Sequence, residues 1–173
     1  MCYNHYMSDY GKAVEVALAA HEGQTDKIGV PYFHHVRAVS ELVQKMPSYA
    51  SFTDEDKLNS IIAGLLHDVV EDSDITIIDL ENLGFNKQVV FAVKLLTFVE
   101  RSDRIAYYEA IMSDPVARLV KTGDLAHNNL YSRRVGLPQE HQDRLAKKYE
   151  KAIEIIVLPE DYEVFVSVIN KTD

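Results

Sequence analysis

The segment from Gly64 to Asp72, which reads GLLHDVVED, places a histidine and three carboxylates directly behind an apolar run. Imidazole and carboxylate groups are the side chains that bind divalent ions such as Mn²⁺, Fe²⁺, Co²⁺ and Mg²⁺. On a helix, His67 and Glu71 stand four residues apart, as do Asp68 and Asp72, so two neighbouring rows form. Carboxylates stacked at a helix C-terminus are unfavourable because the helix dipole is negative there, and a cation would relieve the conflict. If the six residues from His67 to Asp72 are considered alone, a helix end exposed to solvent explains them as well as a bound cation does.

A second polar group lies in the segment LVKTGDLAHNNL, where Lys121, Asp124 and Asn128 follow the i, i+3, i+7 spacing of one helical stripe. The leucines and valines around them predict a partly buried helix, and a buried aspartate needs a cation or several hydrogen bonds. A local ion pair between Lys121 and Asp124 is the simpler interpretation of this segment alone, because such pairs are common on helices.

The third group is PYFHHV, in which His34 and His35 follow a turn. Successive helical residues point about 100° apart, so one imidazole is expected to face inward and the other outward. Together the three segments predict a mixed imidazole and carboxylate site at the centre of a bundle, which suits Mn²⁺, Fe²⁺, Co²⁺ or Mg²⁺ better than a closed zinc site. A calcium loop starting at DSDIT is excluded, because Ile77 and Leu83 occupy the positions of the required glycine and glutamate.

The elements that must position these residues are helical by periodicity, which predicts an all-α fold, a compact bundle of roughly seven helices. Capping residues and prolines mark the expected boundaries. The expected helices run from Ser8 or Asp9 to about His21, from about His35 to Met46, from Thr53 to Val69, from Thr76 to Leu83, over 87–97 after Asn86, from Asp114 to about Tyr131, from Pro138 to before Pro159, and from Asp161 as a short helix or a strand.

The composition is that of an ordinary globular protein: 173 residues, 47% hydrophobic and 26% charged, with a formal charge of −9. We expect one domain over 1–173. The acidic balance argues against a nucleic-acid partner but not against small phosphorylated ligands. The lone Cys2 excludes an intrachain disulfide and favours a reducing cytoplasm. No apolar run predicts a membrane span or a signal peptide, so no membrane partner is expected. The oligomeric state is not determined by these features.

Three segments carry a family resemblance. HEGQTDKIGVPYFHHV, AGLLHDVVEDSDIT and RLVKTGDLAHNNL resemble, in order and spacing, the hydrolase domain of RelA/SpoT proteins and the small stand-alone alarmone hydrolases. These proteins belong to the HD superfamily of metal-dependent phosphohydrolases. The likeness covers about residues 21–137. A His-Asp doublet alone is weak evidence, whereas HDxxED with these flanking segments is specific.

The resemblance implies a manganese-dependent enzyme that removes the 3′-pyrophosphate of (p)ppGpp, with Fe²⁺, Co²⁺ or Mg²⁺ as other possible ions. It assigns the role of metal ligand to His35 rather than to His34, because His35 lies three residues after Tyr32. It also implies that the substrate is a phosphorylated nucleotide. The implied metal ligands are His35, His67, Asp68 and Asp124; the implied catalytic pair that activates water is Glu71, the first choice for the base, and Asp72; the implied substrate-binding residues are Lys27, Lys121 and Asn128.

The chain departs from the family pattern at two positions, with Val36 in place of a proline and Asp26 in place of the arginine beside the guanine. Asp26 removes a cation that could stack on the base. This favours, as an alternative, an HD phosphatase of another nucleotide or of NADPH. A nucleotide-sensing module without turnover is the alternative from another class, and an intact Glu71–Asp72 pair argues against it.

Some expectations stay open. Tyr107 or Tyr108 could line the pocket, although packing is the more common role for such tyrosines, and His127 has no assigned role. Because the sequence ends at Asp173 without a synthetase domain, the chain is expected only to degrade alarmones.

Overall fold

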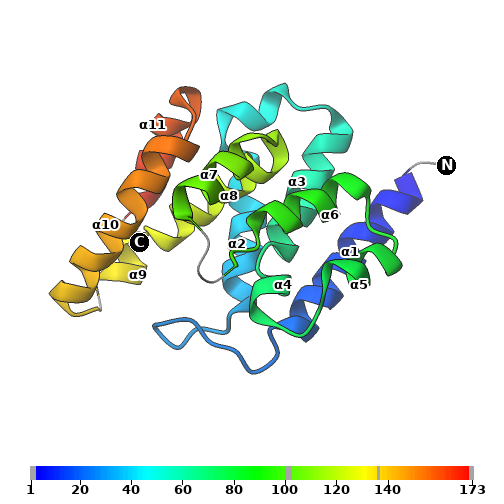
Figure 1. Cartoon of the computed structure of the whole chain (residues 1–173), viewed down its shortest axis with the longest axis horizontal. Coiled ribbons are helices and arrows are strands. Elements are labelled where there is room, and N and C mark those ends of the chain that lie inside the picture. The colour runs from blue at the N-terminus through cyan, green and yellow to red at the C-terminus, as the bar shows by residue number, and fades with distance from the viewer. Residues whose placement is uncertain (1–2, 100–102, 136, 172–173) are drawn as a thin grey trace.

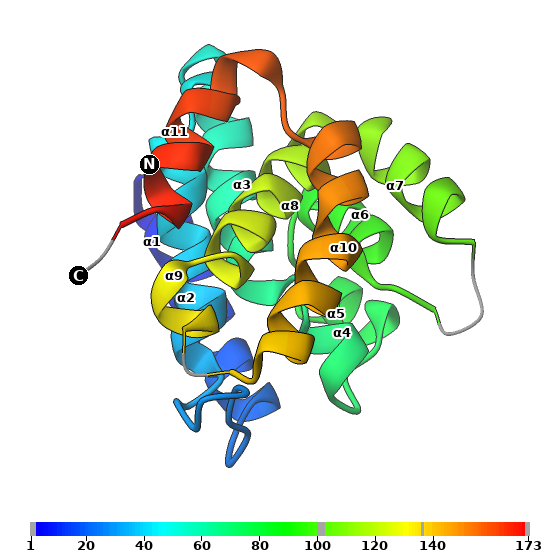
Figure 2. The same ribbon diagram turned by 90° about the vertical axis from the view of Figure 1, so that its left-hand side faces the viewer.

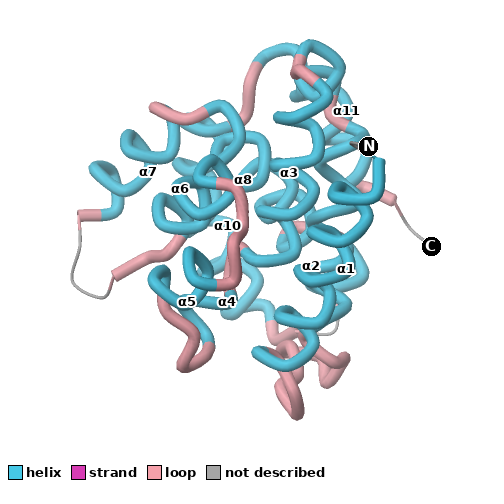
Figure 3. Tube along the Cα trace, turned by 90° about the vertical axis from the view of Figure 1, so that its right-hand side faces the viewer, coloured by secondary structure: helices cyan, strands magenta, loops and turns pink. Residues whose placement is uncertain are grey.

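The computed structural model describes residues 3–99, 103–135 and 137–171, so Cys2 lies outside the described residues. The predicted all-α class is confirmed: Figure 1 and Figure 3 show helices joined by loops, and the β structure of the described residues is limited to one isolated bridge between Thr25 and Pro31. The elements are α1 (Tyr3–Ala20), α2 (Phe33–Leu42), η1 (Val43–Lys45), η2 (Pro47–Ser51), α3 (Asp54–Leu66), α4 (Val69–Asp72), α5 (Ile77–Asn82), α6 (Lys87–Leu96), α7 (Arg104–Met112), α8 (Pro115–Asn128), α9 (Tyr131–Arg134), α10 (Gln139–Ile156) and α11 (Pro159–Ile169).

Helices α2, α3 and α8 pack on one another at the centre; α2 and α8 carry two of the polar groups, and the third lies in the turn after α3 and on α4. Their close approach depends on two glycines. A Cβ on Gly64 would lie 2.9 Å from the Cα of Ser40, and a Cβ on Gly123 would lie 3.3 Å from the carbonyl of Val39. The Ser40 hydroxyl also donates to the carbonyl of Ile61, which ties α2 to α3 at 2.9 Å. The centre of the bundle is therefore tightly packed directly behind the polar residues.

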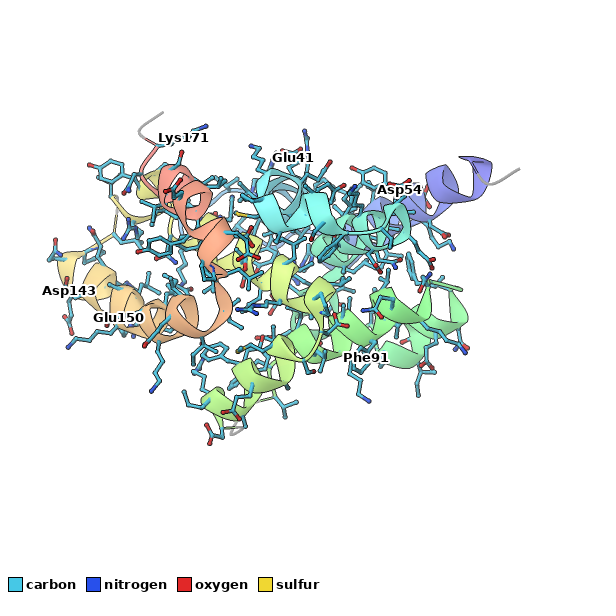
Figure 4. All side chains as sticks on the ribbon, turned by 90° about the horizontal axis from the view of Figure 1, so that it is seen from above. Glu41, Asp54, Phe91, Asp143, Glu150 and Lys171 are labelled. Atoms are coloured by element: carbon cyan, nitrogen blue, oxygen red, sulfur yellow. The ribbon has the colours of Figure 1, made fainter. Side chains whose placement is uncertain are left out.

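The remaining helices cover this centre. Figure 2 shows α10 beside α7 and α8, with α11 above α9, and α1 behind α2. Asp161 on α11 accepts hydrogen bonds from the backbone and hydroxyl of Ser48, which fixes α11 to η2. Charged side chains such as Glu41, Asp54 and Glu150 stand on the outer surface in Figure 4. Among the described residues, no helix combines the length and the apolar character that crossing a membrane requires.

Four predicted helix starts are confirmed by the caps that predicted them. The side chains of Thr53 and Asp114 accept from the backbone at the third residue of α3 and α8. Thr76 and Asp79 form a reciprocal capping box at the start of α5. Asn86 accepts from Gln88 at the start of α6.

The prediction that one helix runs from Thr53 through Val69 is wrong, because α3 ends at Leu66. Asp68 has φ −101° and ψ −4°, and the new helix α4 begins after it. The His67 Nδ1 atom bonds the carbonyl of Gly64, only three residues earlier, which tightens the turn. Glu71 and Asp72 therefore occupy a short second helix rather than the C-terminal end of α3.

Other boundaries also differ. α1 begins at Tyr3, before Ser8, since residues 3–8 contain no proline or glycine that would stop it. α8 ends at Asn128 rather than near Tyr131, and the C-terminal segment is the helix α11 rather than a strand. The described residues contain more helical segments than the expected seven, because α4, α7 and α9 were not predicted as separate helices.

Candidate metal centre and nucleotide pocket

Four side chains from three elements meet at one point. His35 lies in the first turn of α2, His67 and Asp68 form the turn after α3, and Asp124 lies on α8. The His35 Nε2 atom lies 3.4 Å from Asp68 Oδ2 and 3.3 Å from Asp124 Oδ1. The His67 Nε2 atom lies 3.0 Å from Asp68 Oδ2 and 3.8 Å from Asp124 Oδ1. Potential ligand atoms of His35, His67 and Asp68 all lie within 4.8 Å of one another.

This spacing fits a divalent ion. Ligand atoms at 2.1 Å from a common ion lie about 3.0 Å apart in octahedral geometry and about 3.4 Å apart in tetrahedral geometry. His67 supplies a second observation: its Nδ1 atom bonds the Gly64 carbonyl at 2.8 Å and must therefore carry the proton. Among the described residues, its buried Nε2 atom has no hydrogen-bond partner, as expected for the nitrogen of a metal ligand.

The charges of the cluster also fit a cation. Burial by itself would raise the pKa of both aspartates, but His67 beside Asp68 and Lys121 beside Asp124 hold these pKa values well below 3.8. Burial would lower the pKa of His67, but Asp68 and Asp124 raise it to about 10. A proton on His67 thus occupies the place that a metal ion would take, because a ligating imidazole must be neutral.

Two residues beyond this set orient the cluster, and no role had been assigned to either from the sequence. The Nδ1 atoms of His35 and His127 lie 2.8 Å apart, so one imidazole donates to the other. Burial, His35 and Arg133 lower the pKa of His127 to about 3, which keeps His127 neutral. The Tyr32 hydroxyl donates to Asp68 Oδ2 at 2.7 Å, and burial and Asp68 raise its pKa, so that Tyr32 keeps its proton.

The expected inward and outward division of the two neighbouring histidines is confirmed, since His35 is 2% exposed and His34 is exposed. The expected stripe on α8 is also present. Lys121 Nζ lies 2.8 Å from Asp124 Oδ2, and the Asn128 amide donates to Asp124 Oδ1 at 2.5 Å. The local pair and the central site therefore coexist, because Asp124 has two oxygens.

Glu71 and Asp72 stand beside the cluster on α4. The Glu71 Oε2 atom accepts from the backbone N–H of Phe98 at 2.8 Å. Partial burial and the nearby Asp68 raise the pKa of Glu71, and the N–H of Phe98 opposes this increase only in part. Partial burial and Asp68 also raise the pKa of Asp72. Asp72 is anchored through its carbonyl, which accepts from the Gln24 amide at 2.7 Å, and Gln24 in turn bonds His21.

A cavity of about 450 Å³ opens in front of these groups, between α4, α7, α8, α10 and the loop before α2. It contains all three expected substrate-binding residues. The tyrosines at 107 and 108 also line it, although Tyr107 is anchored by a hydrogen bond to the Leu96 carbonyl and Tyr108 is buried. Its charged and aromatic lining consists of the acids Asp26, Asp68, Glu71, Asp72 and Asp124, the cations Lys27, Arg104, Lys121, Arg133 and Lys148, and the rings Tyr32, Phe98, Tyr107, Tyr108 and Tyr149, with Asn128 beside them.

Comparisons with known proteins agree with this geometry. Residues 13–144 match the family model described as HD domain. The bifunctional (p)ppGpp synthase/hydrolase SpoT of Escherichia coli K12 is 32% identical over 133 residues, which are 68% of this chain and 17% of that protein. The human guanosine-3′,5′-bis(diphosphate) 3′-pyrophosphohydrolase MESH1 is 35% identical over 125 residues, which are 68% of this chain and 65% of that protein.

A solved structure, described as a metazoan ortholog of SpoT that hydrolyses ppGpp, superposes with a TM-score of 0.72 at 25% identity. The alignment covers 94% of this chain and 93% of that one. The chain therefore matches a small protein over nearly its whole length, but only about a sixth of the bacterial enzyme. With the family model matching most of its residues, the chain belongs to the HD domain family.

Proposed function

We propose that this protein is a metal-dependent nucleotide phosphohydrolase that removes the 3′-pyrophosphate of (p)ppGpp, giving GDP or GTP and pyrophosphate. The observation that carries the proposal is the convergence of two imidazoles and two carboxylates on one point at the wall of a cavity, with Glu71 and Asp72 beside them. The printed activities of the human and metazoan relatives support the choice of substrate.

In this proposal His35, His67, Asp68 and Asp124 hold the ion. Their mixed nitrogen and oxygen ligands suit Mn²⁺, Fe²⁺, Co²⁺ or Mg²⁺, and the family resemblance favours Mn²⁺ among these. When bound, a divalent ion supplies a Lewis acid that lowers the pKa of water and offsets phosphate charge. His127 and Tyr32 keep His35 and Asp68 oriented through the hydrogen bonds described above.

The other residues act on water and substrate. A carboxylate with a raised pKa is a suitable general base near neutral pH, so Glu71, assisted by Asp72, takes the proton of the attacking water. The water oxygen forms the new bond to phosphorus, and the bond between phosphorus and the 3′ oxygen breaks. The proton that Glu71 accepted passes, directly or through solvent, to the leaving oxygen, which becomes the 3′ hydroxyl of GDP or GTP. Lys121 and Asn128 hold Asp124 in place and, together with Lys27, face the substrate in the cavity.

The test is to incubate Mn²⁺-loaded protein with ppGpp and identify the products by phosphorus NMR. GDP and pyrophosphate are expected. Glu71→Gln should lower turnover by roughly 10²- to 10⁴-fold while leaving the affinity for ppGpp in place. The exposed Glu41→Gln is the matched control and should keep full turnover. Cleavage of another phosphorylated nucleotide without release of pyrophosphate from ppGpp would reject the assignment.

The same experiment separates the alternatives. Asp26 favours a phosphatase of another nucleotide or of NADPH, which would release orthophosphate from that substrate instead. A nucleotide-sensing module would bind ppGpp without turnover, and Glu71→Gln would change nothing measurable. We also infer a single domain over 1–173 in the cytoplasm. The domain inference is supported by one hydrophobic core that includes residues from Ala13 to Val168.

A further inference from the structure

Arg133 on α9 enters the cavity from the side of the loop before α2, and the family resemblance assigns no role to it. Its Nη1 atom lies 2.9 Å from Asp26 Oδ2, and the two side chains are only 15% and 4% exposed. The Asp26 Oδ1 atom accepts from the backbone of Ile28 and Val30 at 3.0 and 2.9 Å. Asp26 is thus a fixed anchor, which holds the guanidinium of Arg133 at one edge.

The ion pair with Asp26 leaves most of the guanidinium N–H groups of Arg133 without a partner among the described residues. Within the described residues, only its Nη1 atom has a hydrogen-bond or ion-pair partner. The other guanidinium N–H groups are donors, and arginine has no acceptor. Because Asp26 cancels the charge of Arg133, these donors suit neutral acceptors better than they suit a phosphate. Tyr149, whose aromatic ring could pack against a base, lines the same cavity as Arg133.

The cations that suit phosphate are different residues. Among the described residues, Lys27, Arg104 and Lys148 have no carboxylate within 4.0 Å. Partial burial and the neighbouring Arg104 and Lys27 lower the pKa of Lys148, which indicates mutual repulsion that an anion would relieve. Among the described residues, the cavity therefore has three cations without a carboxylate partner beside the Arg133–Asp26 pair, whose charges cancel.

We propose that Arg133, held in place by Asp26, reads the purine base of the substrate and selects guanine over adenine. Guanine presents two adjacent acceptors, O6 and N7, which match a two-pronged donor. Adenine replaces the first acceptor with an amino donor, which would face an N–H group. Asp26 is then a positioning residue. In this chain the arginine beside the base comes from α9, whereas the family pattern places an arginine at the position of Asp26 in the loop before α2. The proposal rests on the proposed nucleotide substrate.

The test measures dissociation constants for ppGpp and ppApp in EDTA, so that binding is read without hydrolysis. The wild type should bind ppGpp about tenfold or more tighter than ppApp. Arg133→Gln should bring the two constants close together by weakening ppGpp binding. Arg133→Lys, which keeps the charge but loses the fork, should do the same, and Asp26→Asn should lower the preference in part.

Arg37→Gln on the outer face of α2 is the control and should keep the preference. Thermal melting establishes that each variant folds. Equal weakening of both nucleotides in Arg133→Gln would mean a phosphate contact and would overturn the proposal, as would an unchanged ratio or a wild type that binds neither nucleotide. A wild type that prefers ppGpp in EDTA but releases no pyrophosphate with Mn²⁺ would refute the proposed function and leave this inference standing.

Discussion

His67 uses its two nitrogen atoms for two different purposes. One donates to the carbonyl of Gly64 within its own turn, and the other is directed, without a partner, at Asp68 and Asp124. His35 is oriented in the same way from outside its own helix, by His127 on α8. Each imidazole is thus held through its Nδ1 atom with its Nε2 atom facing Asp68 and Asp124, which lowers the cost of ordering the site.

Because His127 contacts His35, we expect removal of the His127 imidazole to weaken metal binding, although His127 is not itself a predicted metal ligand. In His127→Phe, the His35 ring keeps its position in the packing but loses the hydrogen-bond partner of its Nδ1 atom. We expect Mn²⁺ binding to weaken by roughly 10- to 100-fold, measured by titration calorimetry. His34→Phe, which changes the exposed neighbour of His35, should leave the affinity unchanged. Equal affinities in the wild type and His127→Phe would refute the orienting role.

Sequence reasoning identified the residues of the cluster better than their supports. Two histidines and two aspartates were recognisable because they sit in specific segments, and the fold brings all four together. His127 and Arg133 gave no comparable signal, since their partners lie far along the chain, at His35 and Asp26. Such long-range pairs follow from packing and cannot be derived from local spacing.

The close packing of α2, α3 and α8 is the property of the helices on which the cluster depends. Gly64 combines two tasks, because its missing side chain admits Ser40 of α2 and its carbonyl orients His67. Any side chain at this position pushes α2, which carries His35, away from α3, which carries His67. Helix packing and metal geometry are therefore coupled through one residue.

Gly64→Ala should destabilise the fold by about 1–3 kcal/mol, because the new methyl would lie 2.9 Å from backbone and must displace a helix. It should also weaken Mn²⁺ binding. Gly11→Ala in α1 is the control, since its methyl would meet nothing within 4 Å. That variant should be neutral or stabilised by up to about 1 kcal/mol in urea unfolding. Equal stabilities of the two variants would contradict the packing argument.

The capping box of α5 predicts a pH-dependent contribution to stability. The hydroxyl and backbone of Thr76 lower the pKa of Asp79 below 3.8. A carboxyl with a depressed pKa stabilises the fold above its unfolded pKa and loses this effect as the pH falls through its folded value. Asp79→Asn should therefore lower Tm at pH 7, and the difference from wild type should shrink below about pH 3.8. Glu81→Gln on the same helix is the control, and a pH-independent difference for Asp79→Asn would contradict the assignment.

The starts of the helices were predictable because a cap involves residues that are neighbours in the sequence. The end of α3 at Leu66 was not predictable in this way. The apolar period continues through Val69, and only the position of the cluster explains why the chain turns at His67 and Asp68. α7 was missed because only Tyr108 and Ile111 of its residues are buried, which leaves little periodicity. Its cap at Asp103, which accepts from Ile105, was the available signal.

Across the whole molecule, charge is separated in a way that the formal charge of −9 conceals. Four of the five acids of the cavity, Asp68, Glu71, Asp72 and Asp124, lie at or beside the cluster, where a cation is expected. Three cations that have no carboxylate partner among the described residues also line it, namely Lys27, Arg104 and Lys148. This arrangement suits a ligand that carries phosphates and binds together with a metal ion. Net charge alone argued against a nucleic-acid partner but could not reveal this local division.

The most direct test of this account is thermal unfolding with and without Mn²⁺ in the wild type and in His67→Gln, alongside the number of ions bound per chain. Ligand at about 100 times its Kd adds about 2.7 kcal/mol, and about 2–4 °C per kcal/mol is usual for a chain of this size. We predict one Mn²⁺ per wild-type chain, a rise in Tm of roughly 5–10 °C that EDTA reverses, and no rise in His67→Gln. A wild type whose Tm ignores Mn²⁺, or a variant that responds equally, would contradict the convergence of these residues on a metal ion.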